Sequence, residues 1–259
     1  MIALSYLHAL TRRRATSDAL PAGELVLSDV VADRARLARY AQLCGFPAGD
    51  TLPPVYPHVL AFPAALALLT RRDFPLPALG LVHVANRVTA RRPIGAGERL
   101  TLRVRAADLR GTAFDIVTRV SVGEEPVWES ASTYLHREPG RTGERSPTPL
   151  AVQGESMVWP VPVNTGRRYA AVSGDRNPIH LHALTARMFG FRTAIAHGMW
   201  AKARALAALG PPGAFTAEVA FRSPIALPSS VRLVTDGRRL ALTTPDGERT
   251  HLYGSITES

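Results

Sequence analysis

The sequence from residue 173 to residue 180 reads Ser173-Gly174-Asp175-Arg176-Asn177-Pro178-Ile179-His180, and it places a carboxylate and an imidazole five residues apart. Asn177-Pro178 predicts a turn between them, which bends the backbone so that the two side chains can converge. An aspartate can act as a general base, and a histidine can share or return the proton. The stretch therefore predicts an acid–base site built on Asp175 and His180.

The residues on either side extend this pattern. Tyr169 precedes it, and Ala196-His197-Gly198-Met199 follows it. Together these residues resemble the signature of the MaoC-like dehydratases, a family that includes the (R)-specific enoyl-CoA hydratases. The resemblance implies that residues 196–199 stand at the start of a central helix. It also implies a double hot-dog fold, in which each of two repeats wraps a sheet around one long helix.

The chain itself divides into two parts around a segment rich in proline, glycine and charge. Residues 137–150 show no apolar periodicity and are typical of a linker. We therefore expect an N-terminal hot-dog domain at residues 1–136, which is degenerate, and a C-terminal catalytic MaoC-like domain at residues 151–259.

The two parts align as repeats, which favours the double hot dog independently of the resemblance. Residues 40–46 align with 169–175, and each of these segments begins with a tyrosine. Farther along the chain, residues 57–60 align with 196–199, and residues 84–88 align with 219–223. Each repeat therefore predicts a leading segment, then a helix, then several strands.

Hydrophobic patterning predicts an α+β fold with antiparallel sheets. Residues 61–69 and 199–209 are apolar on most faces, as expected of helices buried against a curved sheet. Asp236-Gly237 and Asp246-Gly247 predict hairpin turns. A period near two predicts strands at residues 81–84, 100–104, 114–117, 127–135, 217–221, 231–234, 239–243 and 251–256.

Only the second repeat carries the acid–base residues. The first repeat has Phe46 where the second has Asp175, and Pro47-Ala48-Gly49-Asp50 follows in place of an Asn-Pro-x-His sequence. A phenylalanine cannot move a proton, so we predict that the first repeat has lost its chemistry and kept its fold. It either shapes the acyl pocket of a pseudo-dimer or only buttresses the second repeat.

The reaction we infer is the reversible addition of water to a trans-2-enoyl thioester. Asp175 and His180 would hold the water, with Asp175 as the base, and the same pair would supply a proton on the same face. Gly198 at a helix start would offer backbone N–H groups to the developing oxyanion, and its lack of a side chain would let the thioester approach closely. The resemblance implies the (R)-3-hydroxyacyl product.

Neighbouring polar residues have alternative interpretations. Asp175 alone could be a helix N-cap, and Asn177 could cap the following helix or orient His180. His197 could touch the thioester, although a structural role at the helix entry is favoured. His182 is expected to be a solvated helix residue, and Ser173 and Tyr169 are expected to be structural.

No dissociable cofactor is expected, because coenzyme A or acyl carrier protein would enter only as part of the substrate. The spacing of His180 and His182 does not match the i, i+4 arrangement of helical metal ligands, so no metal is expected either. The sequence lacks Gly-x-Gly-x-x-Gly and phosphate-loop patterns, and it lacks a Gly-x-Ser-x-Gly elbow.

Composition favours a cytoplasmic protein without a nucleic-acid or membrane partner. The formal net charge is +10, but the basic residues are scattered arginines and Lys202 is the single lysine. One cysteine, Cys44, excludes an internal disulfide, and no apolar run approaches the length of a membrane span. The arginines at 12–14 follow the apolar first ten residues, which is the wrong order for a secretory signal.

Two other functions remain open at the level of sequence. A hot-dog acyl thioesterase would use a carboxylate but would not need the Asn-Pro-x-His continuation. A non-catalytic acyl-thioester-binding subunit would not need the intact pair of Asp175 and His180. The expected partner is in every case an acyl-CoA or an acyl carrier protein thioester, and a homodimer is compatible with the fold.

Overall fold

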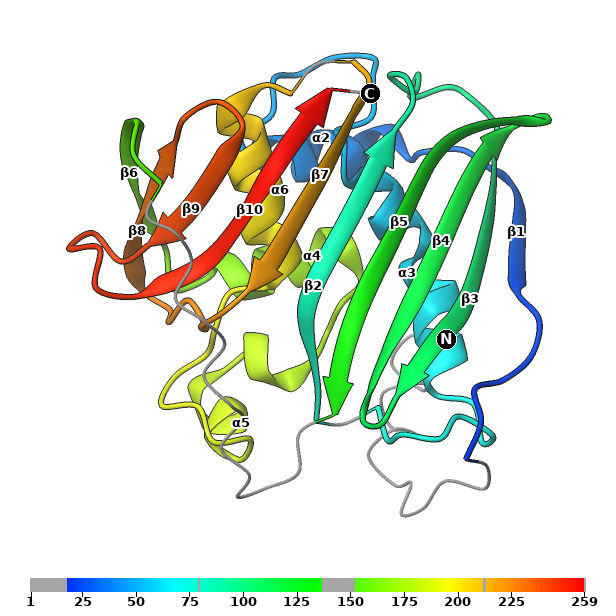
Figure 1. Ribbon diagram of the computed structural model, residues 1–259, viewed down its shortest axis with the longest axis horizontal. Helices are drawn as coiled ribbons and strands as arrows, with labels where there is room; N and C mark the ends of the chain where they lie inside the picture. Colours follow the sequence, from blue (N-terminus) through cyan, green and yellow to red (C-terminus); the bar gives the residue numbers. More distant parts are fainter. Residues whose placement is uncertain (1–17, 79, 137–151, 212, 259) are drawn as a thin grey trace.

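The computed structural model describes residues 18–78, 80–136, 152–211 and 213–258. Ten strands form one antiparallel sheet in the order β1-β3-β4-β5-β2-β7-β10-β9-β8-β6 (Figure 1). The strands are β1 (Leu25–Val30), β2 (Leu81–Ala90), β3 (Leu100–Arg110), β4 (Ala113–Val122), β5 (Glu125–His136), β6 (Glu155–Val161), β7 (Phe215–Phe221), β8 (Ser229–Thr235), β9 (Arg239–Thr243) and β10 (Thr250–Glu258). The helices are α2 (Arg34–Cys44), α3 (Tyr56–Leu69), α4 (Thr165–Ser173), the 3-10 turn η1 (Pro178–His180), α5 (Ala183–Arg187) and α6 (Gly198–Leu209).

The sheet consists of two equivalent sets of five strands. Within each set the first, third, fourth, fifth and second strands along the chain lie side by side. The second strands of the two sets, β2 and β7, pair antiparallel from Ala85 opposite Ala220 to Ala90 opposite Phe215. This arrangement confirms the double hot dog predicted from the repeat, with both halves sharing one continuous sheet.

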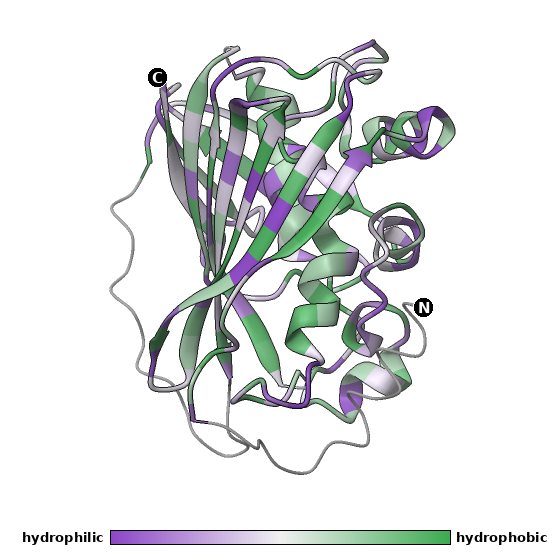
Figure 2. Cartoon of the chain, turned by 90° about the vertical axis from the view of Figure 1, so that its right-hand side faces the viewer, coloured by the Kyte–Doolittle hydropathy of each residue, from purple (hydrophilic) through white to green (hydrophobic). Residues whose placement is uncertain are grey.

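The helices lie on one face of this sheet, and α3 and α6 are the central helices of the two halves (Figures 1 and 2). Helix α6 begins one residue before the predicted start. Helix α3 begins at Tyr56 rather than at residue 61, so the predicted start was wrong. The reason is local: Pro57 suits the first turn of a helix, and Tyr56 and Val59 are fully buried against the core.

All the predicted strands are present, and most extend beyond the predicted bounds. The two hairpin turns are confirmed, because Asp236-Gly237 joins β8 to β9 and Asp246-Gly247 lies between β9 and β10. The outermost strands β1 and β6 were not predicted. Both lie at a sheet edge, where exposed residues interrupt the two-residue alternation.

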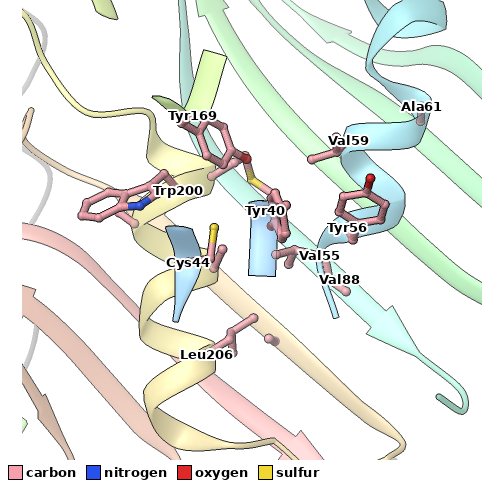
Figure 3. Close-up of a cluster of buried hydrophobic side chains, with 14 of the residues drawn as sticks. Tyr40, Cys44, Val55, Tyr56, Val59, Ala61, Val88, Tyr169, Trp200 and Leu206 are labelled. Atoms are coloured by element: carbon pink, nitrogen blue, oxygen red, sulfur yellow. The ribbon is translucent and has the colours of Figure 1, made fainter. Parts of the chain in front are cut away.

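The alignment of residues 40–46 with 169–175 corresponds to helices α2 and α4. Each helix ends in a left-handed glycine, Gly45 with φ 82° and Gly174 with φ 84°. Phe46 and Asp175 therefore follow equivalent helix ends. The buried rings of Tyr40 and Tyr169 lie with their centroids 6.1 Å apart in the shared core (Figure 3).

A polar network connects the two halves beneath the β2–β7 pairing. Lys202 on α6 is fully buried, and its Nζ donates to the Asn86 carbonyl at 3.1 Å, to Asn86 Oδ1 at 2.6 Å and to the Ala217 carbonyl at 3.0 Å. Asn86 Nδ2 donates in turn to Ser132 Oγ on β5 at 3.0 Å. Burial lowers the pKa of Lys202 well below 10.5. We call Lys202, Asn86 and Ser132 the inter-half network.

Two of the sequence predictions concern residues outside this description. The expected linker, residues 137–150, and the apolar first ten residues both lie in segments that are not described. Within the described ranges, no helix is both long enough and apolar enough to cross a membrane.

We predict that Lys202→Met lowers the free energy of unfolding by about 3 kcal/mol, because removing one partner leaves buried acceptors unpaired. Asn86→Leu should also destabilise the protein. In the double variant both partners are gone, so its loss should be smaller than the sum of the two single losses. Urea denaturation of the four proteins measures this coupling, and strictly additive losses would contradict the network.

Candidate active site

The backbone after α4 is shaped by its own short polar side chains. The Asp175 N–H donates to Ser173 Oγ at 3.1 Å, and the Asn177 N–H donates to Asp175 Oδ1 at 3.1 Å. The Asp175 side chain is 27% exposed. The Asp175 carboxylate therefore accepts a hydrogen bond from the backbone of its own loop and does not cap a helix. It also remains partly exposed to solvent.

Asn177 has the capping role that the sequence offered as one alternative. Its side-chain oxygen accepts from the Ile179 N–H at 3.3 Å and caps the 3-10 turn η1. Since His180 is the last residue of that turn, Asn177 positions His180 through the backbone.

His180 is held in one tautomer. Its Nδ1 lies 2.8 Å from the Ile195 carbonyl, which can only accept, so Nδ1 carries the proton and Nε2 presents a lone pair. The backbone of His180 packs directly on Gly166 of α4, where an added Cβ would lie 2.0 Å from the His180 carbonyl oxygen. The sequence analysis missed both Ile195 and Gly166, because neither is a residue type that suggests chemistry.

His197 is the N-cap of α6 and is 3% exposed. Its Nε2 donates to the Asp175 carbonyl at 3.1 Å and lies 3.8 Å from Asp175 Oδ2. Its ring stacks on His180 with centroids 3.7 Å apart, and the Tyr169 ring lies 4.8 Å away. Burial, and next the neighbouring His180, lower the pKa of His197 to about 3. Burial also lowers the pKa of His180, so both rings are neutral at pH 7.

Asp175, His180 and His197 together bring one carboxylate oxygen and two ring nitrogens within 4.8 Å of one another. Such a spacing allows one water molecule to bridge the carboxylate and an imidazole. A carboxylate and two imidazoles are also ligands that metals use. Here one ring nitrogen of each histidine already donates a hydrogen bond to a carbonyl oxygen, so that nitrogen is not open to a metal. A metal-free site therefore stays a prediction. His182 lies apart from this set as the exposed N-cap of α5.

Gly198 is the first residue of α6, as expected for a residue that offers a free helix N-terminus. An added Cβ at this position would lie 3.0 Å from the Phe221 ring of β7. Glycine therefore fits here because the ring of Phe221 already occupies the space beside the backbone.

Three polar residues of the first half interact electrostatically with Asp175, and the sequence analysis did not identify them. His58 of α3, His83 of β2 and Tyr134 of β5 are half-buried, and the charge of Asp175 raises the pKa of each. Burial dominates for the two histidines, so their pKa values fall to about 4 and about 3. No local motif marks these residues, because they meet Asp175 only through the pairing of the two halves.

A cavity lies beside Phe46, between the first half and helix α6 and strand β7 of the second half. It has a volume of about 260 Å³ and is lined mainly by apolar residues, among them Leu52, Trp128, Leu206 and Phe215. Phe46 stands where the second half has Asp175, so this cavity lies at the degenerate counterpart of the Asp–His site.

The fold and the Asp–His site define the class of protein, and the comparisons with known proteins agree with it. Residues 144–235 match the MaoC like domain. The chain is 37% identical over 227 residues to 3-hydroxyacyl-thioester dehydratase X of Mycobacterium tuberculosis, which covers 84% of this chain and 81% of the relative. The chain therefore belongs to the MaoC-like dehydratase family.

Solved structures show the same architecture. The crystal structure of the M. tuberculosis protein HtdX has a TM-score of 0.81 and 34% identity, covering 91% of this chain and all of the other. A MaoC-like dehydratase from Phytophthora capsici has a TM-score of 0.70 at 18% identity, with 93% and 98% covered. A conserved hypothetical protein of M. tuberculosis described as a double hot dog has a TM-score of 0.54 at 12% identity, covering 92% and 96%. The last two support the fold alone.

We predict that Gly166→Ala moves η1 and displaces His180, because the added Cβ would meet a backbone atom that cannot swing aside. The free energy of unfolding should fall by about 1–3 kcal/mol, as measured by urea denaturation. Gly49→Ala is the matched control, since an added Cβ there meets nothing within 4 Å. Equal stability of the two variants would contradict the close packing of α4 on η1.

The neutral His197 predicts a pH dependence of stability. Its pKa is about 3 in the folded protein and near 6.5 when unfolded, so the unfolded chain binds the extra proton between these values. Stability should therefore be highest above pH 6.5 and fall as the pH drops toward 3. In His197→Gln the free energy of unfolding should fall less steeply between pH 6 and pH 5, by about 1.4 kcal/mol per pH unit at most. Urea denaturation at a series of pH values tests this, and an unchanged slope in His197→Gln would contradict it.

Proposed function

We propose that this protein is an (R)-specific enoyl-thioester hydratase, which acts in reverse as a 3-hydroxyacyl-thioester dehydratase. Its substrates are acyl thioesters of coenzyme A or acyl carrier protein, and it uses no dissociable cofactor. The observation that carries the proposal is the meeting of the Asp175 carboxylate with His180, held in one tautomer, beside the free N-terminus of α6. Family membership and the name of the M. tuberculosis relative support it.

In this mechanism a water molecule lies between Asp175 and His180. The lone pair on His180 Nε2 accepts one hydrogen bond from the water, and Asp175 takes a proton as the water oxygen attacks C3. The electrons of the double bond move onto the thioester oxygen. The same acid–base pair then returns the proton to C2 on the same face, so that one water is added and the site is restored.

The developing oxyanion is stabilised at the start of α6. The N–H of Gly198 lies in the first turn, where backbone donors lack intrahelical acceptors and the helix dipole is positive. His197 acts as a positioning residue, because it donates to the Asp175 carbonyl and supports the ring of His180.

We predict that Asp175→Asn lowers the rate of crotonyl-CoA hydration by about two to four orders of magnitude, because the general base is removed. The assay follows the loss of enoyl absorbance, with longer trans-2-enoyl-CoAs as further substrates. Asp18→Asn, at an exposed position, is the matched control and should keep full activity.

The assay also separates the alternatives. Release of free thiol without loss of the enoyl group would show that the protein is a thioesterase and not a hydratase. Wild-type protein that hydrates neither CoA thioesters nor the matching acyl carrier protein thioesters would overturn the proposal.

A further inference from the structure

One group of side chains near the site is polar where a hydrocarbon chain would need apolar neighbours. It comes from the first half and consists of His58, His83 and Tyr134, which we call the polar wall. All three side chains are half-buried and lie within electrostatic reach of Asp175. The mechanism proposed above uses none of them.

The polar wall begins next to the expected position of the thioester. The ring of Phe221, which packs beside Gly198, lies 4.9 Å from the ring of His83. His83 stacks on Tyr134 with centroids 4.6 Å apart and lies 6.2 Å from His58. An acyl chain whose thioester lies at Gly198 would therefore run past Phe221 and reach His83 next.

An irregularity in β2 sets the direction of His83. The pairing of β2 with β5 shifts between His83 and Ala85, so Val84 is an extra residue in the strand. Bulges of this kind re-aim side chains and occur next to active sites. At this bulge the regular alternation of side chains between the two faces of β2 is interrupted, and the ring of His83 lies against the rings of Tyr134 and Phe221.

Hydrogen bonding in the polar wall is incomplete. His83 Nε2 is buried, and among the described residues it has no hydrogen-bond partner. Burial keeps His83 and His58 neutral at pH 7, with pKa values of about 3 and about 4, so they can donate and accept hydrogen bonds without carrying charge. A hydrocarbon chain against this wall would leave these groups unpaired, which costs free energy.

Beyond the polar wall the core closes. The Tyr134 ring lies 5.8 Å from Phe114, which in turn lies 5.0 Å from Phe74, and both phenylalanines are fully buried. The polar wall is therefore the last surface that an acyl chain meets before the packed interior of the first half.

We propose that the polar wall makes the enzyme selective for acyl thioesters that carry an oxygen function, a hydroxyl or carbonyl group, on the chain beyond the double bond. This inference rests on the proposed hydratase function. It assigns to the first half a role in specificity, with His83 as the determining residue and His58 and Tyr134 as its supports.

The test compares kcat/KM for trans-2-hexenoyl-CoA and for its 5-hydroxy and 5-oxo analogues. Wild-type enzyme should prefer an oxygenated substrate by about 10-fold or more, since a site built for hydrogen bonding discriminates against the analogue that lacks the group. His83→Phe keeps the ring stack and removes both nitrogens, so the preference should fall to about one-tenth of its wild-type value or less. His182→Phe, on the exposed surface, is the matched control and should keep the preference.

The outcomes distinguish this inference from the function on which it rests. Equal use of all three substrates by the wild type, or an unchanged preference in His83→Phe, would overturn the selectivity and leave the hydratase intact. Hydration of none of the substrates would overturn the function itself. If His83→Phe does not fold, Tyr134→Phe removes a single hydroxyl from the same wall and carries the test in its place.

Discussion

The pairing of β2 with β7 is the constraint on which the rest of the structure depends. It joins two five-stranded sets into one sheet, and Lys202 fixes the central helix of the second half to Asn86 of the first. A buried lysine is costly unless its hydrogen bonds are satisfied, and here three acceptors satisfy it. The inter-half network therefore specifies how the halves meet, and that pairing places His58 and His83 within electrostatic range of Asp175.

The two halves share a helix end but differ in the residue that follows it. The equivalent helices α2 and α4 both end in a left-handed glycine, yet Phe46 follows the first and Asp175 follows the second. A cavity lined by residues of both halves lies beside Phe46. The charge of Asp175 raises the pKa values of His58, His83 and Tyr134 of the first half, so the two halves interact electrostatically across their pairing.

Sequence alone predicted what is local. Both hairpin turns and the convergence of Asp175 with His180 follow from turn residues and from the short distance along the chain between the two residues. The double hot dog followed from the alignment of the two repeats and from the family resemblance. The start of α3 and the edge strands were missed, because burial and sheet position decide them. Gly166, Ile195 and His83 were missed for another reason: each matters only through a contact made by the tertiary fold. Gly166, for example, looks like any helix glycine until the carbonyl of His180 lies against it.

The Asp175 carboxylate lies beside the rings of His180 and His197, which are neutral at pH 7 because burial lowers their pKa values. His197 Nε2 lies 3.8 Å from Asp175 Oδ2, so a protonated His197 would form an ion pair and occupy the carboxylate. Burial prevents this, because burial and next the stacked His180 together lower the pKa of His197 to about 3. His197 instead donates its N–H to the Asp175 carbonyl, which positions the loop without forming an ion pair with the carboxylate. The same burial that costs stability in acid thus keeps a positive charge away from the Asp175 carboxylate at neutral pH.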